Sequence, residues 1–271
     1  MKARHWLLAH IASLAVALGA ATFATGAVAG RTCEAHAPTV EAVTRGLALA
    51  QKTADALDAT HAQVVVLARA GQDLSKFGLR YSHLGFAYQE TAADGSHAWR
   101  VVHKLNECGT ADSAIYRQGL GEFFLDTPWR YEAAWVVLEP RAQAALLPLL
   151  RDDARVALMH HKPYSMVSYA WSVKYQQSNQ WALETLAAAL QPQVASREAA
   201  QSWLRAEGYR PTTLQLGPLT RLGARMTSAN VAFDDHPPAR RFSDQIDTVT
   251  VDSMFEWLQR AGLGSVPSTI Q

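Results

Sequence analysis

The sequence predicts a mixed α+β domain in which an antiparallel sheet packs on helices. Two strand-like runs, residues 81–88 and 98–105, are joined by a short connection centred on Asp94-Gly95, which is typical of a hairpin. In residues 38–59, by contrast, apolar residues recur at helical spacing. Of the 271 residues 49% are hydrophobic, and the formal net charge is +1. The chain can therefore build a full core, and its charge gives no reason to expect a nucleic-acid partner.

The first 29 residues have the three-part pattern of a secretory signal peptide. Basic Met1–His5 precedes an apolar run over residues 6–23, and Ala27-Val28-Ala29 fits the small-x-small cleavage pattern. An uncleaved membrane anchor is the alternative, which polar residues within the apolar run disfavour. We therefore expect a mature chain, residues 30–271, that is periplasmic or secreted, lacks a transmembrane segment and forms a single α+β domain.

The sequence has two cysteines, Cys33 and Cys108, and both lie in the predicted mature chain. In an oxidising compartment two such cysteines usually pair, so we expect a disulfide. Closing a loop of about 75 residues would add at most about 4 kcal/mol. A catalytic thiol at Cys108 is the alternative, but a turn-like stretch surrounds that residue.

The N-terminal half reads as a helix over 38–59 capped by Thr39, a buried strand over 63–69 and then the hairpin. Residues 112–126 look irregular because they contain Gly119 and Gly121. The remaining predicted elements are a strand over 133–138, a helix over 141–150 starting at Pro140, an ordered aromatic loop over 164–177, a helix from Ser178 to Pro192, a helix capped by Ser196, strands over 212–216, 229–233 and 248–251, a helix over 253–261 and a frayed tail from Gly262.

Two histidines stand out on the hairpin. Alternation along a strand places His83, Gly85 and Ala87 on one face of residues 81–88. His103 lies on the neighbouring strand, so the hairpin register can bring both imidazoles to the same side. Taken alone, each histidine is equally well explained as a structural residue.

Ser178 lies where a polar run ends and an amphipathic helix begins. A serine there faces unpaired backbone N–H groups and the positive end of the helix dipole. The position suits a nucleophile, and it also suits an ordinary N-cap. A serine nucleophile needs a base within hydrogen-bond reach, because its alkoxide is too basic to form unaided.

Ser82-His83-Leu84-Gly85, His103 and Ser178-Asn179-Gln180-Trp181 follow one another in an order that resembles the circularly permuted papain-like hydrolases related to NlpC/P60 peptidases. In those proteins a Ser-His-Val-Gly strand carries the base, a polar residue on the next strand orients it, and a helix opening with Cys brings the nucleophile. The resemblance covers residues 63–190 and implies a permuted papain-like sheet packed on helices. It also implies a Ser178–His83–His103 site, with serine in place of cysteine and a C-terminal extension over 196–271.

The mature chain also resembles an uncharacterised bacterial family of the DUF 2145 type. That likeness rests on Tyr81–Phe86, Trp99–Asn106, Tyr175–Trp181 and Phe233–Pro237. It brings no known activity.

Other residues are candidates for ligand contacts: Gln176 as an oxyanion donor beside the helix start, and Tyr175, Asn179, Trp181, Asp235 and His236 as lining residues. The aromatic residues are equally well explained as core, and the Asp-Asp-His cluster as a hydrogen-bonded turn. The ligand sets are incomplete for a metal, so we expect neither metal nor cofactor. Two functions remain open: an amidase, peptidase or acyltransferase acting on cell-envelope material, or an inactive binding or accessory protein that holds a peptide, glycan or lipid fragment in the same cleft.

Overall fold

The computed structural model describes residues 37–91, 94–126 and 128–271. The predicted signal peptide and Cys33 lie outside the described residues. Cys108 is exposed in the turn after β3. Because Cys33 is not described, the pairing of the two cysteines stays a prediction. Within the described ranges, no helix is both long and apolar enough to cross a membrane.

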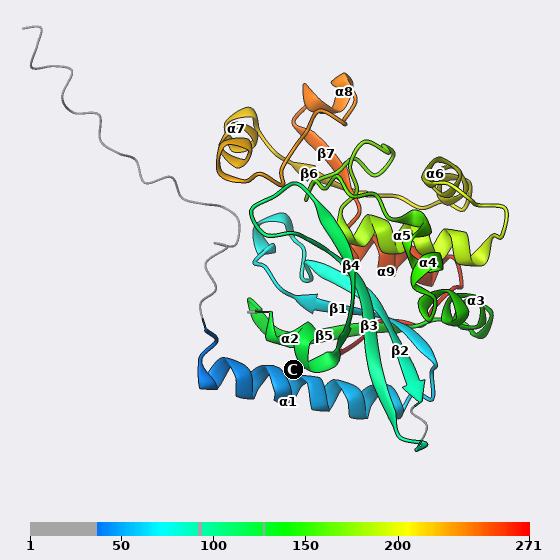
Figure 1. The fold of residues 1–271 in the computed structure, drawn as a ribbon. Coiled ribbons are helices and arrows are strands. Elements are labelled where there is room, and N and C mark those ends of the chain that lie inside the picture. The colour runs from blue at the N-terminus through cyan, green and yellow to red at the C-terminus, as the bar shows by residue number, and fades with distance from the viewer. Residues whose placement is uncertain (1–36, 92–93, 127) are drawn as a thin grey trace, which may run out of the picture.

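A six-stranded antiparallel sheet forms the centre of the molecule, with strand order β4-β3-β2-β1-β5-β8 (Figure 1). Its strands are β1 (Val64–Ala70), β2 (His83–Thr91), β3 (His97–Asn106), β4 (Ser113–Gly119), β5 (Arg130–Val137) and β8 (Ser268–Ile270). A separate two-stranded ribbon is made of β6 (Thr212–Gln215) and β7 (Gln245–Thr248). The antiparallel sheet, together with the helices, confirms the predicted α+β class.

Helices cover both faces of the large sheet (Figure 1). One face packs against α1 (Val40–Asp58) and the short α2 (Leu120–Leu125). The other packs against α3 (Pro140–Leu150), α5 (Ser178–Leu190) and α9 (Val251–Arg260), with α6 (Arg197–Ala206) lying on α5. Smaller helices are α4 (Asp153–Val156), α7 (Pro218–Thr227) and α8 (Pro238–Arg241), and short 3-10 turns span Ser75–Phe77 and Ala157–Met159.

The predicted antiparallel hairpin is confirmed. Strands β2 and β3 pair antiparallel, with Phe86 opposite Val102 and Ala87 opposite Val101. Leu84 and Phe86 belong to the core beneath α5, whereas Ala87 belongs to the core beneath α1 and α2. Alternation along β2 therefore sorts its side chains as the sequence predicted.

Four predicted segments differ from the structure. In the strand expected over 248–251, β7 ends at Thr248, and Thr250 is instead the N-cap of α9. Residues 112–126, expected to be irregular, form β4 and α2. Gly119 and Gly121 lie where the strand meets the helix and do not interrupt the regular structure. The tail expected to fray contains β8, which pairs with the edge of β5. Both strands gain their order from pairing with a distant strand, and such pairing leaves little local signal in the sequence.

Residues 229–233, expected to be a strand, are an irregular segment instead. Their backbone groups bond to the 164–177 loop. Asn230 O accepts from the Met166 N–H, and the Ser165 hydroxyl bonds both N and O of Ala232. Backbone N–H and C=O groups of this segment are thus hydrogen-bonded without pairing as a β-strand.

Candidate functional site

The first turn of α5 is where the candidate nucleophile lies. Gln177 is the N-cap, and its side-chain oxygen accepts from the Asn179 N–H at 2.8 Å. Ser178 is the first helical residue and is buried. Of the two alternatives for Ser178, the N-cap is therefore not what the structure shows, because Gln177 holds that position. Ser178 remains beside the positive end of the helix dipole.

Asn179 joins the start of α5 to the start of β2. Its side-chain oxygen accepts from the Leu84 N–H at 3.1 Å. Pairing between β2 and β3 begins only at Phe86 and Val102, so the Leu84 N–H has no β3 partner in the ladder. The amide of Asn179 takes that place and brings the first turn of α5 to the point where the two strands separate. Residues next to His83 and Ser178 are thus in direct contact.

The two predicted histidines form a hydrogen-bonded pair. His83 Nε2 lies 2.8 Å from His103 Nδ1, and His103 Nε2 lies 2.8 Å from Gln118 Oε1 on β4. Both imidazoles contact the Phe123 ring of α2, with ring centroids 6.0 and 5.3 Å away. Sequence reasoning missed Gln118, because β4 had been read as irregular.

This arrangement sets the tautomers. Burial, helped by the Arg69 charge, lowers the pKa of His103 to about 3, so this imidazole is neutral at physiological pH. Since Gln118 offers an oxygen, the single proton of His103 lies on Nε2, and its Nδ1 accepts. His83 then donates through Nε2 to His103 Nδ1. The chain of bonds thus fixes the orientation of the His83 ring.

Gly85 allows the two strands to approach closely at the histidine pair. A Cβ at this position would lie 2.8 Å from His103 Cβ and 2.8 Å from Val102 O. We expect Gly85→Ala to destabilise the fold by about 2 kcal/mol, because neither neighbour can yield without moving β3. Urea unfolding measures this. Gly223→Ala is the control: a Cβ there meets no atom within 4 Å, so a helical alanine should instead stabilise slightly. Equal stability of Gly85→Ala and the wild type would contradict the tight approach.

The Ser178 hydroxyl bonds Tyr164 rather than His83. Its Oγ lies 3.5 Å from the Tyr164 phenol oxygen, and no hydrogen bond between described residues joins it to His83. Burial raises the pKa of Tyr164, while bonds from the backbone and side chain of Ser178 act in the opposite direction. The phenol therefore stays protonated and occupies the space beside the Ser178 N–H. Sequence reasoning did not single out Tyr164.

Gln176, the predicted oxyanion donor, is fully engaged within the protein. Its Nε2 donates to Met159 O and to Glu184 Oε2, and its Oε1 accepts from Lys104 Nζ and the His161 N–H. These bonds hold the 164–177 loop against α5. The side chain is therefore structural in this state.

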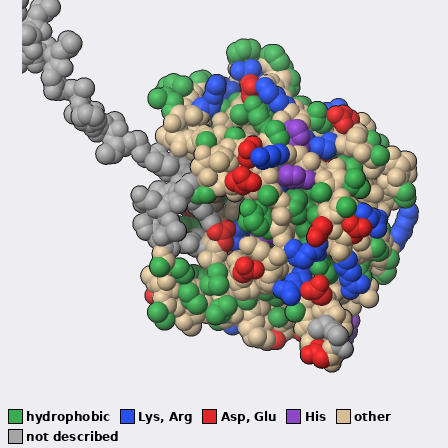
Figure 2. Space-filling view, viewed as in Figure 1, with side chains coloured by type: hydrophobic (Ala, Val, Ile, Leu, Met, Phe, Trp, Pro, Cys, Tyr) green, Lys and Arg blue, Asp and Glu red, His purple; other side chains and the backbone are tan. Residues whose placement is uncertain are grey.

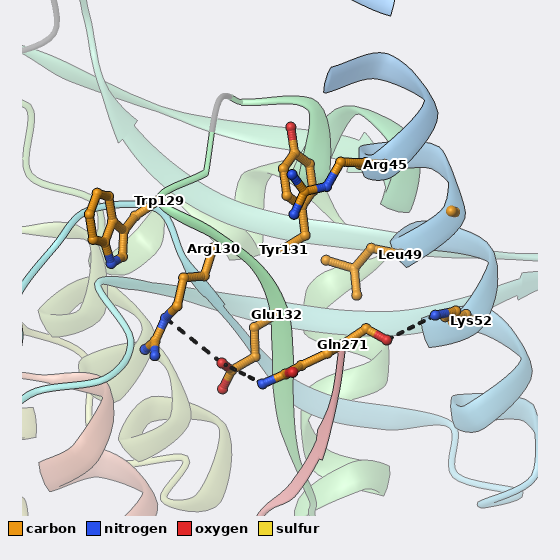
Figure 3. Close-up of a pocket in the computed structure, with 9 residues that line it drawn as sticks. Arg45, Leu49, Lys52, Trp129, Arg130, Tyr131, Glu132 and Gln271 are labelled. Atoms are coloured by element: carbon orange, nitrogen blue, oxygen red, sulfur yellow. Dashed lines mark hydrogen bonds and ion pairs between the residues drawn. The ribbon is translucent and has the colours of Figure 1, made fainter. Parts of the chain in front are cut away.

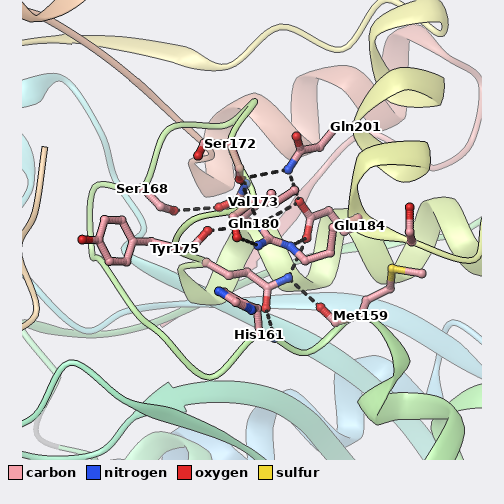
Figure 4. A network of polar contacts seen from close by, with 12 residues as sticks. Met159, His161, Ser168, Ser172, Val173, Tyr175, Gln180, Glu184 and Gln201 are labelled. Carbon is pink, nitrogen blue, oxygen red and sulfur yellow. Dashed lines mark hydrogen bonds and ion pairs between the residues drawn. The ribbon is translucent and has the colours of Figure 1, made fainter. Parts of the chain in front are cut away.

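Glu184 is the centre of that network (Figure 4). The buried carboxylate pairs with Arg197 of α6, whose Nε lies 2.7 Å from Oε2, and accepts from Gln201 at 2.7 Å. Arg197 also donates to the carbonyls of Ser172, Val173 and Tyr175. One ion pair thus fixes the loop that precedes Ser178.

The other predicted contact residues have internal partners. Trp181 is completely buried and packs on Phe86. Asp235 pairs with the His236 ring at 2.9 Å and accepts from the Tyr169 N–H at 2.7 Å. Tyr175 stays partly exposed on the loop. The segment around Asp235 therefore supports the 164–177 loop from the side of β6 and β7, which the sequence had left undecided.

A pocket of about 400 Å3 lies elsewhere, between α1 and β5 (Figure 3). Its walls carry Arg45, Lys52, Trp129, Arg130 and Glu132, and Lys52 donates to Gln271 O at 3.0 Å. None of the residues predicted from the sequence lines it. Among the described residues, no group of three or more His, Cys, Asp or Glu is placed to hold a metal ion.

The fold and the site together define a mixed α/β protein with a buried histidine pair on β2 and β3, and with a helix-start serine whose neighbour Asn179 bonds β2. A family model described as "Uncharacterized protein conserved in bacteria (DUF2145)" matches residues 56–258. That match covers most of the chain, so the chain belongs to this family, as the sequence motifs predicted. No curated protein and no solved structure matches it.

Proposed function

We propose that this chain is an exported acyl-transfer enzyme with a permuted papain-like site, acting on amide or ester bonds of cell-envelope material. The observation that carries the proposal is the hydrogen-bonded chain His83–His103–Gln118, which orients the His83 ring on the strand that Asn179 joins to the start of α5. A base strand, an orienting residue on the next strand and a helix-start nucleophile form the same set of parts as in the papain-like hydrolases that the motifs resemble.

In the proposed reaction the Ser178 hydroxyl leaves Tyr164 and turns toward His83. Its oxygen attacks the substrate carbonyl carbon while its proton passes to His83 Nδ1. Backbone N–H groups at the start of α5 stabilise the oxyanion. His83 then returns the proton to the leaving amine or alcohol, and an acyl ester remains on Ser178. Water hydrolyses that ester, or a second nucleophile accepts the acyl group.

A serine-reactive fluorophosphonate probe tests this mechanism. We expect the probe to label wild-type protein at Ser178, as located by peptide mass spectrometry, and to leave Ser178→Ala unlabelled. His83→Ala should label at least about 100-fold more slowly, because the general base is lost. Ser196→Ala removes a helix-cap serine and should label as the wild type does. Labelling that survives Ser178→Ala would contradict the proposal.

One observation favours a binding protein without turnover as the second candidate. Tyr164 bonds Ser178 and Gln176 is engaged, so these proposed catalytic groups are held by the protein itself. Under this alternative, folded wild-type protein is not labelled, and Tyr164→Phe does not restore labelling. Calorimetry with cell-wall peptide, glycan and lipid fragments then measures binding, and a loss of affinity in Tyr175→Ala would place the ligand at the loop.

A further inference from the structure

Helix α7 turns its apolar stripe toward solvent. Leu219, Leu222 and Met226 recur at helical spacing on one side, and none of the ten residues of α7 is buried. The side that faces the protein carries Ala224, which packs on the small core of β6 and β7, and the aliphatic part of Arg221. A surface helix normally has the opposite orientation, so the stripe serves no purpose in the fold.

Phe242, which follows α8, is a further exposed apolar side chain on a segment that α7 contacts. Arg221 joins the two segments, because its guanidinium donates to Arg241 O and pairs with Asp244 at 2.9 Å. The exposed fractions are 84% for Leu219, 56% for Leu222, 78% for Met226 and 85% for Phe242. Figure 2 shows apolar side chains over α7 and α8 with basic ones among them.

All charged side chains of α7 and α8 are positive. Helices α7 and α8 contain four arginines and no acidic residue. Arg221 and Arg240 pair with Asp244 and Asp247, whereas Arg225 and Arg241 form no ion pair with a described residue. A second copy docked by two-fold symmetry would bring these arginines together, which disfavours a dimer through this face.

We propose that the α7–Phe242 surface binds the interface of an anionic lipid bilayer. Its apolar side chains enter the boundary between headgroups and acyl chains, and Arg225 and Arg241 contact the lipid phosphates. This is the composition expected of an interfacial amphipathic helix: leucine, methionine and phenylalanine on one side and arginine at its border. The inference does not depend on whether Ser178 is a nucleophile.

Vesicle co-sedimentation of the full chain tests the inference. Vesicles of phosphatidylcholine with about one quarter phosphatidylglycerol are compared with vesicles of phosphatidylcholine alone. We expect tighter binding to the anionic vesicles, and a reduction of at least about tenfold in Leu222→Ser/Met226→Ser, since two apolar side chains no longer insert. Arg225→Glu should weaken binding to anionic vesicles and leave binding to neutral ones unchanged.

Leu158→Ser is the matched control, because Leu158 is an exposed leucine away from α7. It should bind as the wild type does. Unchanged binding of Leu222→Ser/Met226→Ser would overturn the proposal and place any lipid contact elsewhere in the chain, including the apolar run over residues 6–23. Sedimentation of wild-type protein as a dimer that the same double substitution dissociates would also overturn it, in favour of a protein partner. Circular dichroism confirms that the variants fold.

Discussion

Replacing Glu184 with glutamine is expected to destabilise the protein by about 3–5 kcal/mol. The carboxylate is almost fully buried and accepts from Arg197, Gln176 and Gln201. The substitution keeps the shape but leaves the Arg197 guanidinium buried without its counter-charge. The new amide N–H group would also face the N–H groups of Arg197, Gln176 and Gln201, which are hydrogen-bond donors themselves. Urea unfolding followed by circular dichroism measures the loss.

An exposed pair of the same kind provides the control. Glu256 and Arg260 lie one helical turn apart on α9, 3.6 Å from each other. Glu256→Gln should cost at most about 0.5 kcal/mol, because water already screens both charges. Similar losses in Glu184→Gln and Glu256→Gln would show that the buried pair is not an essential support. Because the network fixes the loop before Ser178, probe labelling of the Glu184→Gln variant should fall even where the protein remains folded.

Stability is expected to rise with pH through the range in which Lys104 titrates. Burial, together with the Arg197 charge, lowers the pKa of Lys104 from 10.5 to about 6. Between these values the unfolded chain binds a proton that the folded chain does not, so protons favour unfolding. The contribution of Lys104 to the unfolding free energy should therefore increase by about 2–3 kcal/mol from pH 7 to pH 9.

The difference between wild type and Lys104→Met isolates this contribution. The methionine keeps the apolar stem but has no group that titrates, so the wild-type curve should rise relative to the variant curve as pH increases. Below about pH 6 the two curves should run parallel, since Lys104 is then protonated in both states. Lys76→Met, at an exposed lysine, should leave the slope unchanged. Parallel curves for wild type and Lys104→Met between pH 7 and pH 9 would refute the prediction.

Local patterns predicted the centre of the sheet correctly. The Asp94-Gly95 connection and the alternation of residues 81–88 gave the antiparallel hairpin and the face of each side chain. From these followed the meeting of His83 and His103, which the structure shows as a hydrogen bond of 2.8 Å. Thr39 and Ser196 were likewise correct as N-caps, because capping depends on residues three positions away.

Interactions between distant segments were beyond such patterns. Gln118 completes the histidine chain from β4, an edge strand whose ladder partner is β3. Two features depend on how the 164–177 loop folds back over α5. Gln177 rather than Ser178 is the N-cap, and the hydroxyl of Ser178 bonds Tyr164. That loop is in turn held by Glu184 and residues around Asp235, far along the chain.

The sequence by itself therefore determined the family, the hairpin and the sharing of one hairpin face by the two histidines, because strand period and turn chemistry act over a few residues. Only the tertiary structure decided which side chains have hydrogen-bonding partners within the protein. In the folded chain Gln176 is hydrogen-bonded, Lys104 is buried without an ion-pair partner among the described residues, and the apolar stripe of α7 faces solvent. These outcomes depend on desolvation and on partners brought together by packing, neither of which leaves a periodic signal in the chain.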